Sequence, residues 1–400
     1  MKIAHLVYQS LPNISGSSIR TRDIVYSQKS IGLEPFVISS PFQNGITNDK
    51  VEIINEIKHY RTFRGNNSYL VSENKSSLKI RIKKLFSIFN FYIESKNIIE
   101  KKRPEIIHAH ATFFCCITAI IIGKQFKIPV CYEIRSLWEE RELNSAKSWI
   151  DNIQPKIIRK LETLSARNVN KVFVINQNLK HNIEKRGIED VVLIPNAVNV
   201  DLVKKSVAKA KDESLISFGY IGSLSPIEGL HLVLEVWHDL EKVGFCNIFH
   251  IYGGGTNFQQ LKNLKERLKI KNVKFHGKIP PHEIFKAYQK IDVMVYPRIK
   301  INITDTVTPL KPLEAMLFKK LVIASDVGGM KELIENDLTG LLFKADSKES
   351  LKNRILEVID KGINRNIINT AKNEVITKRN WRINAQIYQR HYIKLLEEIN

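Results

Sequence analysis

Short apolar runs alternate with longer helix-like segments along this chain, and the alternation occurs twice. The first half carries runs at residues 3–7, 36–39, 106–108, 130–132, 172–175 and 191–194. The second half carries runs at residues 216–221, 247–252, 273–275, 293–296, 321–324 and 341–343. Strands that alternate with helices form βαβ units, in which neighbouring strands are parallel. The sequence therefore predicts an α/β protein with two parallel sheets.

Length and composition agree with two domains. A chain of 400 residues exceeds what one core usually organises, and 43% hydrophobic residues suffice for two cores. The stretch 199–214 is charged and has no strand pattern, so we place the domain boundary near residue 205. The predicted domains are residues 1–205 and 206–378, and residues 381–398 are helical by pattern.

The net charge of +21, from 62 basic and 41 acidic side chains, predicts a surface that attracts anions. Nucleotide diphosphates, acidic lipid headgroups and nucleic acid are the candidates. The basic residues are spread along the chain and match no nucleic-acid-binding motif, so we expect no nucleic-acid partner. The four cysteines lack paired metal-ligand spacing, and we expect neither a disulfide nor a zinc site.

The N-terminus enters a strand-like run directly, with no apolar segment long enough for a signal peptide, and the stretch 113–123 is too short to span a bilayer. We therefore expect a cytoplasmic protein. Residues 78–92 mix cations with bulky apolar side chains at roughly helical spacing. Such a helix suits peripheral contact with the anionic inner face of the cell membrane, or it simply covers a sheet. Both can hold if its two sides differ.

Residues 307–316 read Val-Thr-Pro-Leu-Lys-Pro-Leu-Glu-Ala-Met and precede the run 321–325 and an Asp-Val-Gly-Gly turn. A loop of backbone amides that leads into a helix can face phosphates. A carboxylate in the first turn can accept hydrogen bonds from ribose hydroxyls. The segment therefore predicts a nucleotide site, whose members are Thr308, Pro309, Leu310 and Glu314.

Other motifs follow the predicted strands. Glycine-bearing loops at Gly16-Ser17 and Gly253-Gly254 either bring amides close to a phosphate or serve only as turns. Further along, the segment 131–141 combines Arg135, Trp138 and Glu139. Sugar C–H faces stack on an aromatic ring while hydroxyls bond charged groups, so this segment suits carbohydrate; a core Trp among surface charges is the alternative.

These motifs, in this order and over nearly the whole chain, resemble glycosyltransferase family 4. The resemblance implies the GT-B fold, two Rossmann-like domains that face each other across a cleft. It also implies retention of configuration, an acceptor-binding first domain, a nucleotide-sugar-binding second domain, and a last helix (379–400) that crosses back to the first. Segments 18–21, 131–141 and 307–314 further resemble a branch, the bacterial exopolysaccharide glycosyltransferases associated with the exosortase system.

The resemblance implies roles for single residues. His110, at the exit of the strand that contains His108, would contact the transferred sugar. Backbone near Lys278 and Ile279 would face the nucleobase, and Gly222 would lie beside the donor. Arg20 would join Arg135, Trp138 and Glu139 at the acceptor.

The chain departs from the family pattern at the donor diphosphate. Ser223 and Glu228 stand where most members carry an arginine and a lysine. A glutamate cannot stabilise a leaving diphosphate, so we predict that Arg298 and Lys311 substitute.

A second departure affects the first acid of the family Glu-x7-Glu pair. Thr306 occupies its position, with Asp305 beside it. In relatives this acid bonds hydroxyls of the donor sugar, so its change leaves the identity of that sugar open.

The sequence thus predicts a retaining transferase that uses a UDP- or GDP-type nucleotide sugar. A polysaccharide, a lipopolysaccharide or a polyprenyl-linked precursor is the expected acceptor. No Asp-x-Asp motif occurs near a strand end in the cleft regions, so we expect no metal and no cofactor. Two alternatives remain: a GT-B nucleotide-sugar epimerase or hydrolase, and a non-catalytic, membrane-associated scaffold.

Overall fold

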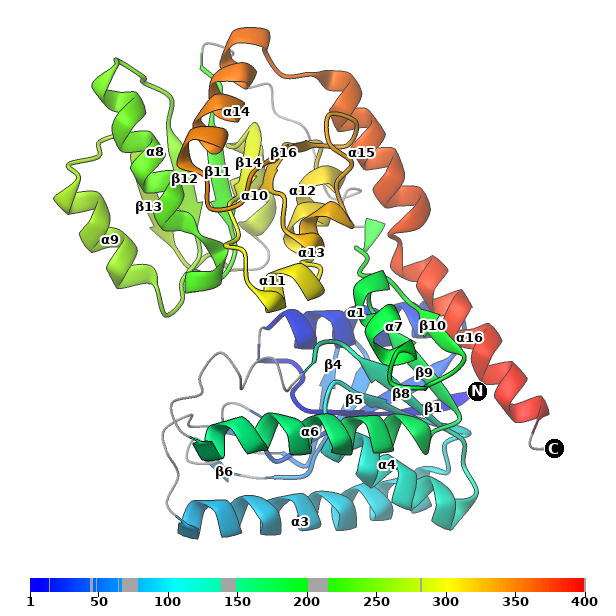
Figure 1. The fold of residues 1–400 in the computed structure, drawn as a ribbon. Coiled ribbons are helices and arrows are strands. Elements are labelled where there is room, and N and C mark those ends of the chain that lie inside the picture. Colours follow the sequence, from blue (N-terminus) through cyan, green and yellow to red (C-terminus); the bar gives the residue numbers. More distant parts are fainter. Residues whose placement is uncertain are drawn as a thin grey trace. The chain divides into compact units, whose positions relative to one another are not determined.

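The computed structural model describes residues 1–13, 15–43, 46–47, 49–63, 65–66, 78–137, 149–200, 215–280 and 283–398. The chain divides into two compact units (Figure 1). The first unit comprises Met1–Asn196 together with Trp381–Asn400, and the second comprises Ala197–Asn380. The boundary predicted near residue 205 falls within 201–214, outside the described residues.

The first unit is built on an eight-stranded sheet with the order β10-β9-β8-β7-β1-β2-β5-β4. Its strands are β1 (Lys2–Val7), β2 (Glu34–Ser39), β4 (Val51–Ile54), β5 (Ile57–Arg61), β7 (Ile106–His110), β8 (Val130–Ile134), β9 (Lys171–Val174) and β10 (Val191–Leu193). All neighbours pair in parallel except β4 and β5. Two short strands, β3 (Ile46–Thr47) and β6 (Gly65–Asn66), form a separate antiparallel pair. The parallel strands are almost continuously buried, because helices cover both faces.

Two groups of helices cover this sheet. In Figure 1, α3 (Leu78–Lys102), α4 (Phe113–Phe126) and α6 (Trp149–Arg167) form one layer, in which α4 contacts both of the others. α1 (Gly16–Ser30) packs against α16 (Trp381–Glu397), and the short α7 (Gln177–Glu184) leads into β10. α1 begins at a capping box between Ser15 and Ser18, which satisfies backbone N–H groups of its first turn. The last helix of the chain, α16, therefore belongs to the same unit as the N-terminal residues.

The second unit holds a six-stranded parallel sheet with the order β13-β12-β11-β14-β15-β16. Its strands are β11 (Phe218–Ile221), β12 (Phe249–Tyr252), β13 (Val273–Gly277), β14 (Val293–Tyr296), β15 (Leu321–Ser325) and β16 (Leu341–Phe343). Its helices are α8 (Leu230–Lys242), α9 (Phe258–Arg267), α10 (Ile284–Gln289), α11 (Asn302–Thr306), α12 (Lys311–Leu317), α13 (Gly328–Lys331), α14 (Lys348–Lys361) and α15 (Arg365–Lys378), and one 3-10 turn, η2 (Pro226–Glu228), precedes α8. Trp237 on α8 is fully buried and meets Phe218 and Phe249 edge-on, which locks α8 onto the sheet.

The structure confirms the α/β prediction, and all the predicted strands are present with ends that shift by at most two residues. The sequence analysis missed the β4–β5 hairpin. Its turn is Asn55-Glu56, and both residues have positive φ (49° and 63°). A two-residue hairpin turn with positive φ at both positions is usually signalled by a glycine, which is missing here. Among the described helices, none is long and apolar enough to cross a membrane.

Candidate active site

In the second unit, glycines let three neighbouring strand ends approach each other closely. A Cβ on Gly253 would lie 1.8 Å from the carbonyl oxygen of Gly222, and its φ of 140° also favours glycine. The Gly253 amide donates to the Gly277 carbonyl at 2.7 Å, and the Gly222 amide donates to Tyr252 at 2.9 Å. Gly254 faces the stem of Lys278, whose Cε would be 2.8 Å from an added Cβ. The predicted donor glycines of the second unit, Gly222, Gly253 and Gly254, therefore meet at one edge of the sheet.

A cluster of buried and half-buried charges lies at this edge. Lys311, the first residue of α12, places its Nζ 2.8 Å from Oε1 of Glu228 on η2. The same ammonium donates to the Tyr220 hydroxyl at 2.5 Å and lies 3.5 Å from Oγ of Ser223. Arg298, just after β14, places its Nε 3.9 Å from Oε2 of Glu228. The two cations predicted to substitute at the diphosphate thus converge on the glutamate at position 228.

Electrostatics keeps this cluster charged. Burial alone would raise the pKa of Glu228, but Lys311 and Arg298 outweigh burial and hold that pKa below its ordinary value. Burial lowers the pKa of Lys311, and attraction to Glu228 opposes that effect. The result is a buried carboxylate with one buried cation, Arg298, and one half-buried cation, Lys311.

Helix α11, which precedes the loop that leads into α12, uses its acidic residue for backbone structure. Asp305 Oδ1 accepts the Gly328 amide at 2.7 Å, and a Cβ on Gly328 would lie 2.5 Å from the Asp305 carbonyl oxygen. Thr306 donates its hydroxyl to Asn302 within α11. Glu314 is half-buried, and the Tyr288 hydroxyl donates to its Oε2 at 3.4 Å. Of the other predicted donor residues, Thr308 is buried, Ile279, Pro309 and Leu310 are half-buried, and Lys278 is exposed.

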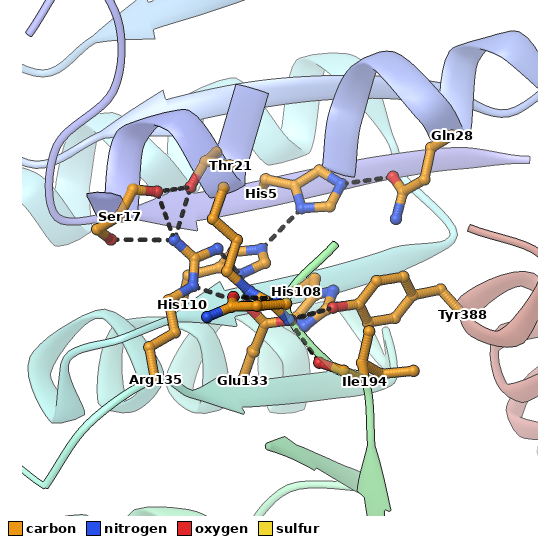
Figure 2. Close-up of polar contacts among 12 residues, drawn as sticks. His5, Ser17, Thr21, Gln28, His108, His110, Glu133, Arg135, Ile194 and Tyr388 are labelled. Carbon is orange, nitrogen blue, oxygen red and sulfur yellow. Dashed lines mark hydrogen bonds and ion pairs between the residues drawn. The ribbon is translucent and has the colours of Figure 1, made fainter. Parts of the chain in front are cut away.

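The first unit has its own buried carboxylate, Glu133 of β8, which Figure 2 shows among its partners. Arg20 approaches Glu133 Oε1 at 3.1 Å, and Arg135 approaches the same oxygen at 2.7 Å. The Tyr388 hydroxyl of α16 donates to the other oxygen. Burial alone would raise the pKa of Glu133, but the two guanidinium groups hold it far below its ordinary value. This carboxylate is therefore ionised and fully paired.

Arg20 uses all five of its N–H groups inside the protein. Beyond Glu133, it donates to the Ile194 and Pro195 carbonyls and to the Asn196 side chain. Its guanidinium also lies 4.8 Å from the ring centre of Trp381. The arrangement makes Arg20 a structural tie between α1, the segment after β10 and α16, and its contact with an acceptor stays a prediction from the resemblance.

Arg135 connects the first turn of α1 to a histidine. Its Nη1 donates to the Ser17 carbonyl at 2.8 Å and to Oγ of Ser17 at 3.0 Å, while Nη2 donates to Nδ1 of His110 at 2.8 Å. Gly16 and Ser17 themselves are exposed. The structure thus brings together the predicted residues Ser17, Arg135 and His110.

The tautomer of His110 follows from this contact, because a guanidinium can only donate. Nδ1 accepts, so Nε2 carries the proton and donates to Nδ1 of His5 at 2.8 Å. Burial and the neighbouring Arg135 lower the pKa of His110 to about 4. His110 is only 1% exposed, and it is neutral near pH 7.

The hydrogen-bond chain continues beyond His5 to the last helix. Nε2 of His5 donates to Gln28 at 2.8 Å, and the amide of Gln28 donates to the Tyr392 hydroxyl at 3.2 Å. That hydroxyl donates to Nδ1 of His108 at 2.6 Å. Burial also places the pKa of His5 and of His108 well below the ordinary value.

His5, His108 and His110 are close enough to be considered as metal ligands, since one ligand atom from each lies within 4.8 Å of the others. Their contacts favour a polar chain instead. His5 and His110 already share a hydrogen bond, and Arg135 donates directly to His110. A dication here would meet this guanidinium at close range.

Family models match both units. Residues 58–202 match the model described as Glycosyltransferase Family 4, and residues 203–374 match the model described as Glycosyl transferases group 1. An uncharacterized glycosyltransferase of Methanocaldococcus jannaschii is 22% identical over 92% of each chain. The chain is a GT-B glycosyltransferase. Two solved structures share this fold: sucrose-phosphate synthase from Thermosynechococcus elongatus (TM-score 0.78, 18% identity, 99% of each chain) and Anabaena HepE in complex with UDP-glucose (TM-score 0.70, 17% identity, 100% of each chain).

Sequence reasoning missed several members of these glycosyltransferase clusters. Tyr388 and Tyr392 stand four residues apart on α16, a spacing that puts both on one helix face, and this was the available signal. Nothing in the sequence marked Gln28 or Tyr220. The predicted acceptor residues Trp138 and Glu139 lie outside the described residues.

The buried histidines predict acid sensitivity of this glycosyltransferase. For His110 the folded-state pKa of about 4 lies below the unfolded value of about 6.5, so the unfolded chain binds more protons between these values. Stability is therefore lost as pH falls. For His110 alone we expect a loss of about 2 kcal/mol between pH 7 and pH 5, measured by urea unfolding.

The control separates this effect from general acid sensitivity. His110→Gln should show a smaller loss between the two pH values than the parent, whereas His181→Gln, at an exposed position, should match the parent. Equal losses in the parent and His110→Gln would contradict the assignment.

Proposed function

We propose that this chain is a retaining, metal-independent transferase that moves a sugar from a UDP- or GDP-type donor to a glycan or lipid-linked acceptor. The observation that carries the proposal is the cluster of Lys311 and Arg298 around Glu228 at the strand ends of the second unit. Two cations at this edge suit a diphosphate. UDP-glucose bound to a protein of the same fold supports the donor class.

The donor roles follow the resemblance, residue by residue. Lys311 and Arg298 hold the diphosphate, and Glu314, one turn into α12, accepts hydrogen bonds from the ribose. Backbone at Lys278 and Ile279 faces the base. No metal is required in this scheme, because side-chain cations and amides balance the phosphate charge.

The chemistry needs no enzyme nucleophile. The bond between the sugar and the diphosphate breaks, the acceptor oxygen bonds to the same carbon, and the proton of the acceptor hydroxyl passes to the leaving phosphate oxygen. We assign neutral His110 an indirect part in placing the sugar, through Arg135, because both of its ring nitrogens already bond Arg135 and His5. The acceptor class, a bacterial polysaccharide, lipopolysaccharide or polyprenyl-linked precursor, rests on the resemblance.

The first test is nucleotide binding without metal. UDP or GDP at a hundredfold excess over its dissociation constant should stabilise the folded protein by about 2.7 kcal/mol, and EDTA should leave this gain unchanged. Thermal melting with each nucleotide, with and without EDTA, measures the effect. Loss of the gain in EDTA would contradict metal independence.

The second test addresses the ribose contact. Glu314→Gln keeps the shape of the side chain but removes its charge, so nucleotide binding should weaken by about 1.5 to 3 kcal/mol, measured by calorimetry. Glu349→Gln is the matched control, because Glu349 also lies in the first turn of a helix but is exposed on α14. If both variants bind like the parent, Glu314 does not hold the ribose.

Helix α3 supports peripheral membrane contact as part of this function. Phe91 and Ile99 of α3 are fully buried, whereas Leu85, Phe86 and Phe89 are 67%, 66% and 59% exposed. The helix therefore packs on one side and presents bulky apolar groups on the other, beside the exposed Lys83. Apolar side chains next to cations suit an interface with anionic lipid.

Vesicle binding tests this contact. The triple variant Leu85→Ser, Phe86→Ser, Phe89→Ser should bind phosphatidylglycerol vesicles at least tenfold more weakly than the parent in a sedimentation assay, because the membrane contact loses the three exposed apolar side chains that would enter the lipid. The control is Val243→Ser, at a 75% exposed position of the second unit. Equal binding by the parent and the triple variant would refute a membrane role for α3.

A further inference from the structure

Lys311 lies between the two positions at which most family 4 members carry their diphosphate cations. Its Nζ is 2.8 Å from Oε1 of Glu228 and 3.5 Å from Oγ of Ser223. A lysine at 228 and an arginine at 223 would reach the volume that the Lys311 ammonium occupies here. The cation in this volume thus comes from α12 instead of from the loop after β11.

Gly222, directly after the end of β11, leaves room for the aliphatic part of the Lys311 side chain. A Cβ on Gly222 would lie 2.5 Å from Cε and 2.8 Å from Cδ of Lys311, so any side chain there would displace the lysine. The Tyr220 ring lies 4.9 Å from Nζ and its hydroxyl accepts from it. Backbone and aromatic neighbours therefore fix Lys311 in one place.

Glu228 holds this cation with one oxygen and leaves the other unsatisfied. Oε2 faces Nε of Arg298 at 3.9 Å, which is too long for a hydrogen bond. Both atoms are buried, and neither has a hydrogen-bond partner among the described residues. A buried charged donor without an acceptor is costly, and an anionic group that reached Arg298 would remove the cost. The cluster is therefore incomplete until such a group arrives.

We propose that Lys311 is a relocated diphosphate cation and that Glu228 is the residue that positions it together with Arg298. While no nucleotide is bound, the negative charge of Glu228 reduces the repulsion between the two cations. When a nucleotide binds, its phosphate oxygens accept hydrogen bonds from the N–H groups of Lys311 and Arg298 that Glu228 does not bond. This inference rests on the proposed function, and it assigns position 228 a supporting role in place of the direct phosphate contact of its relatives.

Moving the charge back to position 228 tests the proposal. Lys311→Met should weaken UDP and GDP binding by roughly a hundredfold, because the phosphate loses a cation and Glu228 keeps only Arg298, at 3.9 Å, as its charged partner. Adding Glu228→Gln to Lys311→Met should recover roughly tenfold of that loss by removing the repulsion. Adding Glu228→Lys instead should recover nearly all of it, since the cation then returns to the same volume from the other side. Calorimetric titration with UDP and GDP measures the affinity of each variant and therefore the order of these affinities.

The control is an ion pair of similar length at an exposed site. Lys361 lies 2.9 Å from Glu357 on α14, and Lys361→Met should leave nucleotide binding unchanged. Melting midpoints without ligand report the folding state of every variant, and pyrophosphate as a second probe isolates the phosphate contact from those of ribose and base.

The outcomes separate this inference from the proposed function. If Glu228→Lys restores no more nucleotide affinity to Lys311→Met than Glu228→Gln does, Lys311 is not a relocated cation. The same conclusion follows if all variants bind nucleotide like the parent and differ only in melting midpoint. A parent protein that binds neither UDP nor GDP would instead overturn the proposed function, and the inference with it.

Discussion

The ion pairs of Glu133 organise the first unit. A buried carboxylate is tolerated only when charged partners and hydrogen bonds replace its water, and removal of one partner from such a pair commonly costs 3 to 5 kcal/mol. Glu133 receives Arg20 from α1, Arg135 from the end of β8 and Tyr388 from α16. Three elements from distant parts of the chain are thereby held at one strand end.

Both units contain a carboxylate between two cations, but only in the first unit are both cations hydrogen-bonded to the carboxylate. Each centres on a buried glutamate between two cations, Glu133 in the first and Glu228 in the second. Around Glu133 the bonds are short, and they extend through Arg135 into a histidine chain. Around Glu228 one oxygen and one guanidinium nitrogen face each other without a hydrogen bond. The first arrangement is suited to hold structure, whereas the second is suited to receive a ligand.

Sequence patterns predicted the sheets well because a parallel strand is buried on both faces, as the run at β15 shows, and such runs stand out locally. The contacts of Arg20 were not predictable in this way, because its partners Glu133 and Asn196 lie more than a hundred residues away. The charge at 228 illustrates the same limit. The sequence analysis named Lys311 as a substitute for the missing lysine, but only the structure shows that its ammonium lies 2.8 Å from the Glu228 carboxylate.

The return of α16 to the first unit has a consequence for the order of synthesis. The ribosome finishes the second unit before it makes Tyr388 and Tyr392. While residues 197–380 are made, Glu133, His108 and Gln28 of the first unit therefore lack their tyrosine partners. Domains usually fold in the order of their emergence. Here the strands that are made first complete their packing with α16 only after the second unit has been made.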